Sequence, residues 1–100
     1  MKVDEITKIP KVLGAGLATD DGFIIESKFI VGYDPEKFSS MAALIMKRIK
    51  KCLNIEKTSA IFYASNSVFF VKNTEAGIFF VICKKDANIG LVKINIDRNT

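Results

Sequence analysis

Residues 34–54 read DPEKFSSMAALIMKRIKKCLN, a stretch long and apolar enough to predict a helix with two defined ends. Asp34 can accept hydrogen bonds from the first free backbone N–H groups, and Pro35 suits the first helical position because it needs no donor there. Glu36 suits the positive end of the helix dipole, and Asn54 suits a left-handed terminator. Basic residues suit the negative end of the dipole, and the last turns contain Lys47, Arg48, Lys50 and Lys51.

The predicted helix has a broad apolar face. At 3.6 residues per turn, one side collects Phe38, Met41, Ala42, Ile45, Ile49, Cys52 and Leu53. Ser40, Lys47 and Lys51 lie opposite. Ala43, Leu44 and Met46 widen the apolar zone beyond what one sheet would cover, and the first two turns are slim. The helix therefore has room for its own sheet and for a second helix alongside.

The composition predicts one globular domain over residues 1–100, because 49% of the residues are hydrophobic and 26% are charged. A core of this size would gain stability from oligomerisation. The formal net charge of +4 permits binding to acidic surfaces, but lysines are interleaved with acids and no basic tail emerges. The charge therefore allows nucleic-acid binding without indicating it.

Residues suited to metal or redox chemistry are scarce. Histidine is absent, and Cys52 and Cys83 lie far apart inside apolar patterns without a CxxC motif. We therefore expect two buried thiols in a reducing compartment, no metal site and no cofactor. Asp4 and Glu5 stand where a signal peptide would be basic and then apolar, and no apolar run approaches the roughly 20 residues of a membrane span. These features predict a soluble, cytoplasmic protein.

A hairpin precedes the long helix. Residues 12–19 and 23–29 read as two strands, and Gly22 supplies the positive φ of the turn between them. The first strand has almost no side-chain bulk at Gly14 and Gly16, so we expect a helix or another backbone to approach it closely.

Three more strands follow, over residues 58–64, 68–72 and 78–83, and their short links predict a meander. Every residue of 78–83 is apolar, so helices should cover both faces of this sheet.

The two ends of the chain are less regular. Val3, Ile6 and Ile9 recur at helical spacing before Pro10, which predicts a short opening helix. In the tail, Val92, Ile94 and Ile96 alternate as in a strand, yet Asp86 could cap a helix in which Ile89 and Ile96 share a face. The pattern leaves both interpretations open.

Catalytic constellations are missing, and we expect no enzyme activity. The absence of histidine removes the commonest general base, and Asp20 and Asp21 are explained by the hairpin turn. Gly14 and Gly16 form no phosphate loop, because Thr19 stands where the pattern needs a third glycine. Four phenylalanines on adjacent strands resemble a base-stacking platform less than a core: Phe69, Phe70, Phe79 and Phe80.

Three segments together resemble the roadblock/dynein light chain family, and within it the stand-alone prokaryotic members of the MglB kind. They are VLGAGL at 12–17, DDGFIIES at 20–27 and DANIGL at 86–91. The resemblance implies an α+β, profilin-like fold with a five-stranded antiparallel sheet of order 2-1-5-4-3. The long helix would cover one face and the N- and C-terminal helices the other. The tail would then be helical, with Gly90 allowing close packing on the sheet.

The resemblance also implies a homodimer in which two long helices lie side by side and the following strands pair. An exposed apolar strand edge at 58–64 fits that assembly. The expected interface residues are Ser39, Ala42, Ala43, Met46, Thr58, Ala60 and Phe62.

The function implied by the resemblance is binding of a small Ras-like GTPase and modulation of its nucleotide cycle. The expected docking surface is Ser40, Lys47, Arg48 and Lys51, and a conformational route is favoured over an arginine finger. One alternative is a passive dimeric adaptor. Another is a basic module for nucleic acid or a small ligand, supported by net charge alone. Homodimer and heterodimer also stay open.

Overall fold

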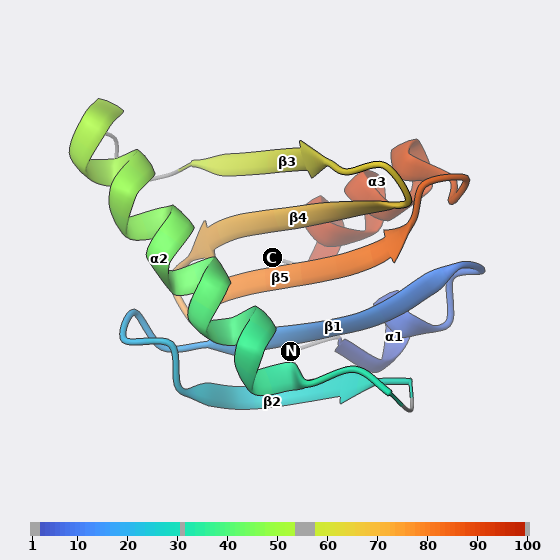
Figure 1. Cartoon of the computed structure of the whole chain (residues 1–100), viewed down its shortest axis with the longest axis horizontal. Coiled ribbons are helices and arrows are strands. Elements are labelled where there is room, and N and C mark those ends of the chain that lie inside the picture. The colour runs from blue at the N-terminus through green and yellow to red at the C-terminus, as the bar shows by residue number, and fades with distance from the viewer. Residues whose placement is uncertain (1–2, 31, 54–57, 100) are drawn as a thin grey trace.

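The sheet of this protein has five antiparallel strands in the predicted order, β2-β1-β5-β4-β3 (Figure 1). The computed structural model describes residues 3–30, 32–53 and 58–99, so the predicted terminator Asn54 lies outside the described residues. The elements are α1 Val3–Thr7, β1 Val12–Ala18, β2 Ile24–Phe29, α2 Pro35–Leu53, β3 Ser59–Tyr63, β4 Ser67–Thr74, β5 Gly77–Lys84 and α3 Ile89–Asn99.

The core has two layers, one on each face of the sheet. On β5, alternate residues such as Phe80 pack under α2, while the intervening residues such as Phe79 pack under α1 and α3. All the residues from Ile78 to Cys83 are buried. The prediction that helices cover both faces is therefore confirmed.

The start of α2 is fixed by capping and by the hairpin. The Glu36 N–H donates to the Asp34 carboxylate at 3.0 Å, as the sequence predicts. Ser39 is fully buried, and its hydroxyl donates to the Gly22 carbonyl at 2.8 Å and to the Glu36 carbonyl at 3.0 Å. Gly22 has φ +91°, and a Cβ added there would lie 3.3 Å from the Cα of Ser40 in the helix. The hairpin turn therefore anchors the first turn of α2.

Aromatic rings, rather than a helix or backbone, fill the space above the small residues of β1. An added Cβ at Gly14 would lie 2.1 Å from the nearest atom of the Phe29 ring, and one at Gly16 would lie 2.5 Å from the Phe80 ring. The expected close approach is therefore present, but its partner differs. These rings belong to a cluster that joins α2 to the sheet with centroids 5.4–6.3 Å apart: Phe29, Phe38, Phe69 and Phe80.

The tail is helical, as the family resemblance implies. Val92 and Ile96, four residues apart, are buried, whereas Ile94 is 55% exposed, which explains the misleading alternation. Asn88 caps α3 by accepting the Leu91 N–H at 3.0 Å, and Asp86 instead binds Lys11.

Two local expectations are wrong. Gly90 lies exposed on α3, and an added Cβ would meet nothing nearer than the Asn88 side chain at 3.6 Å, so it does not permit close packing. Cys52 is exposed near the end of α2, where the helix has left the sheet, while Cys83 is buried as expected.

Gly16→Ala should lower the free energy of unfolding by about 1–3 kcal/mol, because the methyl group would displace a fully buried ring. Gly90→Ala is the matched control, and it should leave that free energy unchanged or raise it by up to about 1 kcal/mol. Urea unfolding followed by circular dichroism measures both. Equal effects of the two substitutions would contradict the proposed packing.

Candidate functional site

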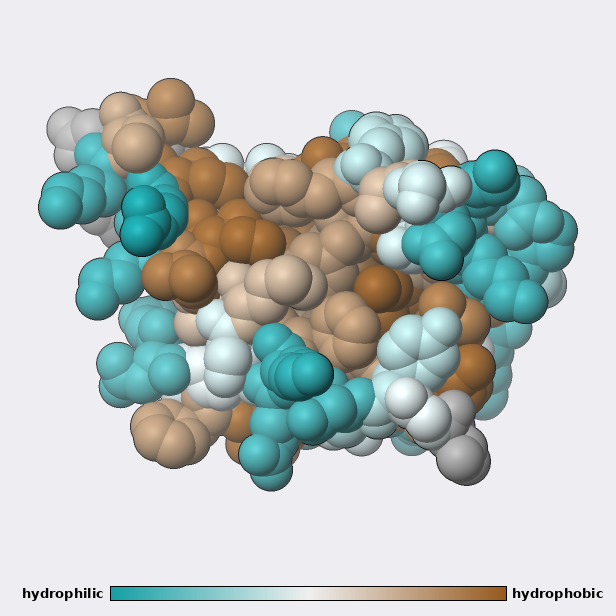
Figure 2. All heavy atoms as spheres, viewed as in Figure 1, coloured by the Kyte–Doolittle hydropathy of each residue, from teal (hydrophilic) through white to brown (hydrophobic). Residues whose placement is uncertain are grey.

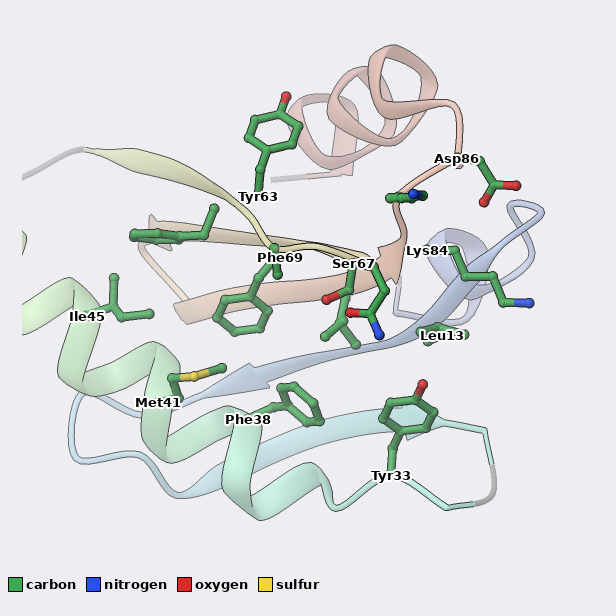
Figure 3. A pocket seen from close by; sticks show the side chains of 15 residues that line it. Leu13, Tyr33, Phe38, Met41, Ile45, Tyr63, Ser67, Phe69, Lys84 and Asp86 are labelled. Atoms are coloured by element: carbon green, nitrogen blue, oxygen red, sulfur yellow. The ribbon is translucent and has the colours of Figure 1, made fainter.

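An open groove of about 890 Å³ lies between α2 and β3 on the α2 face of the sheet (Figure 3). Leu13, Phe69 and Ile82 form its floor. The helix wall is Phe38, Met41 and Ile45, the strand wall is Phe62, Tyr63 and Ala64, and a polar end contains Tyr33, Asn66, Ser67, Lys84, Lys85 and Asp86.

The path of α2 leaves this groove uncovered. Figure 1 shows α2 crossing the sheet obliquely, from above β2 to beyond the start of β3. Its last turns therefore project past the sheet, and Leu53 there is 59% exposed. The other half of the same sheet face has no helix above it, and Figure 2 shows hydrophobic residues gathered there. An uncovered apolar surface beside a helix commonly marks a docking site for another protein.

The outer edge of β3 offers unpaired backbone groups. The Ala64 N–H donates to the Ser67 carbonyl at 2.8 Å, and the Asn73 N–H donates to the Thr58 carbonyl at 3.0 Å. Backbone groups alternate in direction along an antiparallel pair, and Ser59 pairs with Lys72 in the same register. The N–H and C=O groups of Ser59, Ile61 and Tyr63 therefore point away from β4. The apolar groove and an open strand edge adjoin each other.

The polar end of the groove is held by an ion pair. Lys11 Nζ lies 2.5 Å from the Asp86 carboxylate, which ties the start of β1 to the loop before α3. This hydrogen bond lowers the pKa of Asp86 below its ordinary value of 3.8, and the charges of Lys11 and Lys84 act in the same direction. Both partners are largely exposed, so the pair shapes the rim more than it stabilises the fold.

Four of the seven predicted interface residues cannot contact a partner. Ser39, Ala42, Ala43 and Met46 are buried between α2 and its own sheet, with exposed fractions of at most 6%. This part of the prediction is wrong because the side of α2 that was expected to face a partner faces the protein's own sheet instead. A charged residue in place of Ala43 would therefore disrupt the core. The other three lie at the edge strand: Thr58 and Ala60 are half-buried, and Phe62 is 42% exposed in the groove.

The prediction also misses residues that line the groove. Met41 is 40% exposed on α2, and Tyr63 is 72% exposed on β3. Met41 stands four residues before Ile45 on the apolar flank of the helix, and that spacing is the sequence signal that could have identified it. Tyr33 and Tyr63 have no such signal, because the loop and strand that place them are far apart in sequence.

The predicted docking residues share one exposed surface. Ser40, Lys47, Arg48 and Lys51 all lie on the side of α2 away from the sheet, and we call them the basic face. No ion pair within the described residues involves these three cations. After Glu36, α2 contains no acidic residue. The basic face therefore carries one sign of charge.

The described residues offer little for other chemistry. No group of three or more His, Cys, Asp or Glu side chains within them could hold a metal ion. Cys83 is a buried thiol whose pKa is raised by burial, and its Sγ lies 3.7 Å from the Val68 carbonyl oxygen. In the same part of the chain, no helix combines the length and apolar character needed to span a membrane.

Comparison with known proteins identifies the fold. No family model and no curated protein sequence matches the chain. Among solved structures, Myxococcus xanthus MglB is 17% identical, with a TM-score of 0.76 over 96% of this chain and 83% of that one. A Roadblock/LC7 domain from Streptomyces avermitilis is 15% identical, with a TM-score of 0.70 over 98% and 94% of the two chains.

A third structure, the gliding protein MglB from Thermus thermophilus, is 15% identical, with a TM-score of 0.73 over 96% of this chain and 78% of that one. At these identities the likeness establishes the fold. The protein therefore has the roadblock fold, as the sequence resemblance implies, and it is similar to stand-alone prokaryotic MglB proteins.

Proposed function

We propose that this protein is a homodimer that binds a small Ras-like GTPase and modulates its nucleotide cycle. The observation that supports this proposal is the apolar groove beside the open β3 edge, on a roadblock fold shared with MglB. The groove leaves apolar surface that a second copy of the chain would cover. The basic face of α2 is a separate surface, which would stay exposed in the dimer and could bind the GTPase.

A second copy of the chain fits the groove by symmetry. A half-turn about an axis through β3, perpendicular to the sheet, carries the projecting end of α2 onto the uncovered half of the other copy (Figure 1). Leu53 of each copy would then approach the groove of the other, near Phe62. The interface is isologous, so one contact is formed twice.

The same half-turn brings the two β3 edges together. The outward N–H and C=O groups of Ser59, Ile61 and Tyr63 would pair with those of the second copy, which joins the two sheets into one. Pairing removes two open strand edges, and helix docking removes two exposed apolar surfaces.

The dimer would then present two basic faces on the same side of the joined sheet. Lys47, Arg48 and Lys51 from each copy would make a positive surface, which suits an acidic partner and speeds its association. A Ras-like GTPase docked there could be held in the switch arrangement that aligns its own catalytic groups.

Arginine placement favours this conformational route. The sequence has two arginines, and Arg98 lies on α3, on the opposite face of the sheet from α2. Arg48 is therefore the one arginine of the basic face, and it has the exposure of an ordinary solvated helix residue.

Phe62→Glu should convert the dimer to monomer without unfolding it, because Phe62 is exposed on β3 and a carboxylate there would be buried by the second copy. Ile94→Glu is the matched control, since Ile94 is also exposed but lies on α3 across the sheet. Sedimentation velocity gives the masses, and circular dichroism checks the fold. Dimers that persist in Phe62→Glu at micromolar concentration would refute the interface.

Affinity capture from the native cell extract tests the GTPase. The tagged protein should retain a Ras-sized GTPase with a non-hydrolysable GTP analogue more than with GDP. The triple variant Lys47→Glu/Arg48→Glu/Lys51→Glu should lose it and stay dimeric. The control Lys8→Glu/Lys93→Glu/Arg98→Glu changes net charge equally, at exposed positions away from α2, and should retain it. Capture of partners regardless of nucleotide would instead support a passive adaptor.

Arg48→Ala separates two mechanisms of GTPase stimulation. Under the conformational route, the variant should keep stimulated GTP hydrolysis within about tenfold of the unmodified protein, because it removes one of several charges. Loss of more than about a hundredfold at saturating protein would indicate an arginine finger and refute this route.

A further inference from the structure

The strand at the opposite edge of the sheet from β3 is also open. Among the described residues, β2 pairs with β1 alone, and Figure 1 shows it as the outermost strand. The Ile30 N–H donates to the Leu13 carbonyl at 3.0 Å, in register with the pairing of Gly14 and Phe29. By the alternation of antiparallel strands, the backbone groups of Ser27 and Phe29 therefore point to the open edge.

The side chains of this edge form a self-complementary series. Residues 24–30 read IIESKFI, in which apolar pairs flank an acid, a serine and a base. Phe29 stacks on Phe38 of α2, so Ser27 shares the α2 face and Glu26 and Lys28 share the other. Lys28 indeed lies 3.5 Å from Asp4 of α1 on that face, and it is still 58% exposed.

We propose that the β2 edge docks a second copy of this chain, through antiparallel pairing of β2 with β2 about a two-fold axis at Ser27. Glu26 then lies directly opposite Lys28 of the second copy, and the reverse pair forms by symmetry. The β1–β2 register shifts at Ile25, so regular β2–β2 pairing is confined to residues 26–28, with Ile25 and Phe29 at its ends. Ile25 and Ile30 are 53% and 51% exposed in the single chain, so exposed apolar side chains flank the proposed contact.

The charges select this register against its neighbours. A shift that moves the axis to Lys28 places the two Lys28 side chains directly opposite each other, and a shift to Glu26 does the same with two carboxylates. Like charges directly opposite each other destabilise a strand pair, so the axis at Ser27 is the favourable one. Both of these shifts change the pairing by two residues and keep outward backbone groups paired, so the charges decide between these registers. A slip of one residue instead places inward and outward backbone groups opposite each other and loses the backbone pairing.

The consequence is association beyond a dimer. The β2 and β3 edges are at opposite sides of the sheet, so a protein that uses both forms open rows of sheets rather than a closed ring. A single pair of short strands buries less than the roughly 1,200 Å² below which interfaces are generally transient, so this contact is weak and depends on concentration.

Charge exchange tests the contact independently of the proposed β3 dimer. All variants are made in the Phe62→Glu background, which removes the β3 contact if it exists and is harmless if it does not. In this background the chain should associate reversibly to dimers, measured by sedimentation equilibrium over a series reaching millimolar concentration. Glu26→Lys and Lys28→Glu should each weaken that association about tenfold, because two attractive pairs become repulsive.

The double variant Glu26→Lys/Lys28→Glu should restore the association, because it exchanges the two charges and keeps them complementary. The single variants should fold normally, since the Lys28–Asp4 pair is exposed and contributes little stability. Failure of the double variant to restore association would overturn the register. Absence of any association at millimolar concentration would overturn the contact. The charges of Glu26 and Lys28 would then serve to prevent the β2 edge from pairing with other chains.

Ser27→Pro provides a second test that does not depend on charge. The Ser27 N–H points away from β1, so proline there leaves the sheet intact and removes a hydrogen-bond donor at the proposed axis. It should abolish association through β2, whereas Ser27→Ala should preserve it. Equal association in the two variants would contradict backbone pairing at this edge.

Discussion

The stacking of four phenylalanine rings between α2 and the sheet determines where the long helix lies. The rings are Phe29, Phe38, Phe69 and Phe80. Two of them fit because Gly14 and Gly16 leave space on β1 that no larger residue would leave. The cluster holds the first half of α2 over β2 and β1, while the Ser39 hydroxyl fixes the same turn to the hairpin. The second half of α2 therefore runs off the sheet.

Everything proposed for function depends on this oblique position. A helix centred on the sheet would cover both halves and leave no groove. Here the uncovered half exposes apolar side chains next to an open strand edge, while the projecting end of α2 has exposed apolar side chains of its own. Under a two-fold rotation, the projecting end of α2 of one copy covers the exposed half of the other copy's sheet. The solvent side of the helix is then free to carry charge, and it carries one sign.

Local signals in the sequence predict most of the fold, and packing decides the rest. The caps of α2, the turn at Gly22 and the apolar strand 78–83 act over a few residues, so pattern identifies them. The rotation of α2 does not follow from pattern, because both flanks of the helix are apolar. The buried Ser39 hydroxyl bonds to a carbonyl seventeen residues away in sequence, and Met41 is exposed in the groove. The sequence therefore predicts an apolar helix surface beyond its own sheet and an apolar strand edge, but neither the groove between them nor most of the residues that line it.

Amide hydrogen exchange along β3 of the unmodified protein, resolved by residue, is the decisive measurement. The amides of Ser59, Ile61 and Tyr63 point away from β4, so no other described strand protects them. If two copies pair through this edge and fill each other's groove, these amides exchange as slowly as the neighbouring inward amides of Ala60 and Phe62. Exchange at the rate of unbonded amides, at concentrations where the inward amides stay protected, would contradict the dimer and the function built on it.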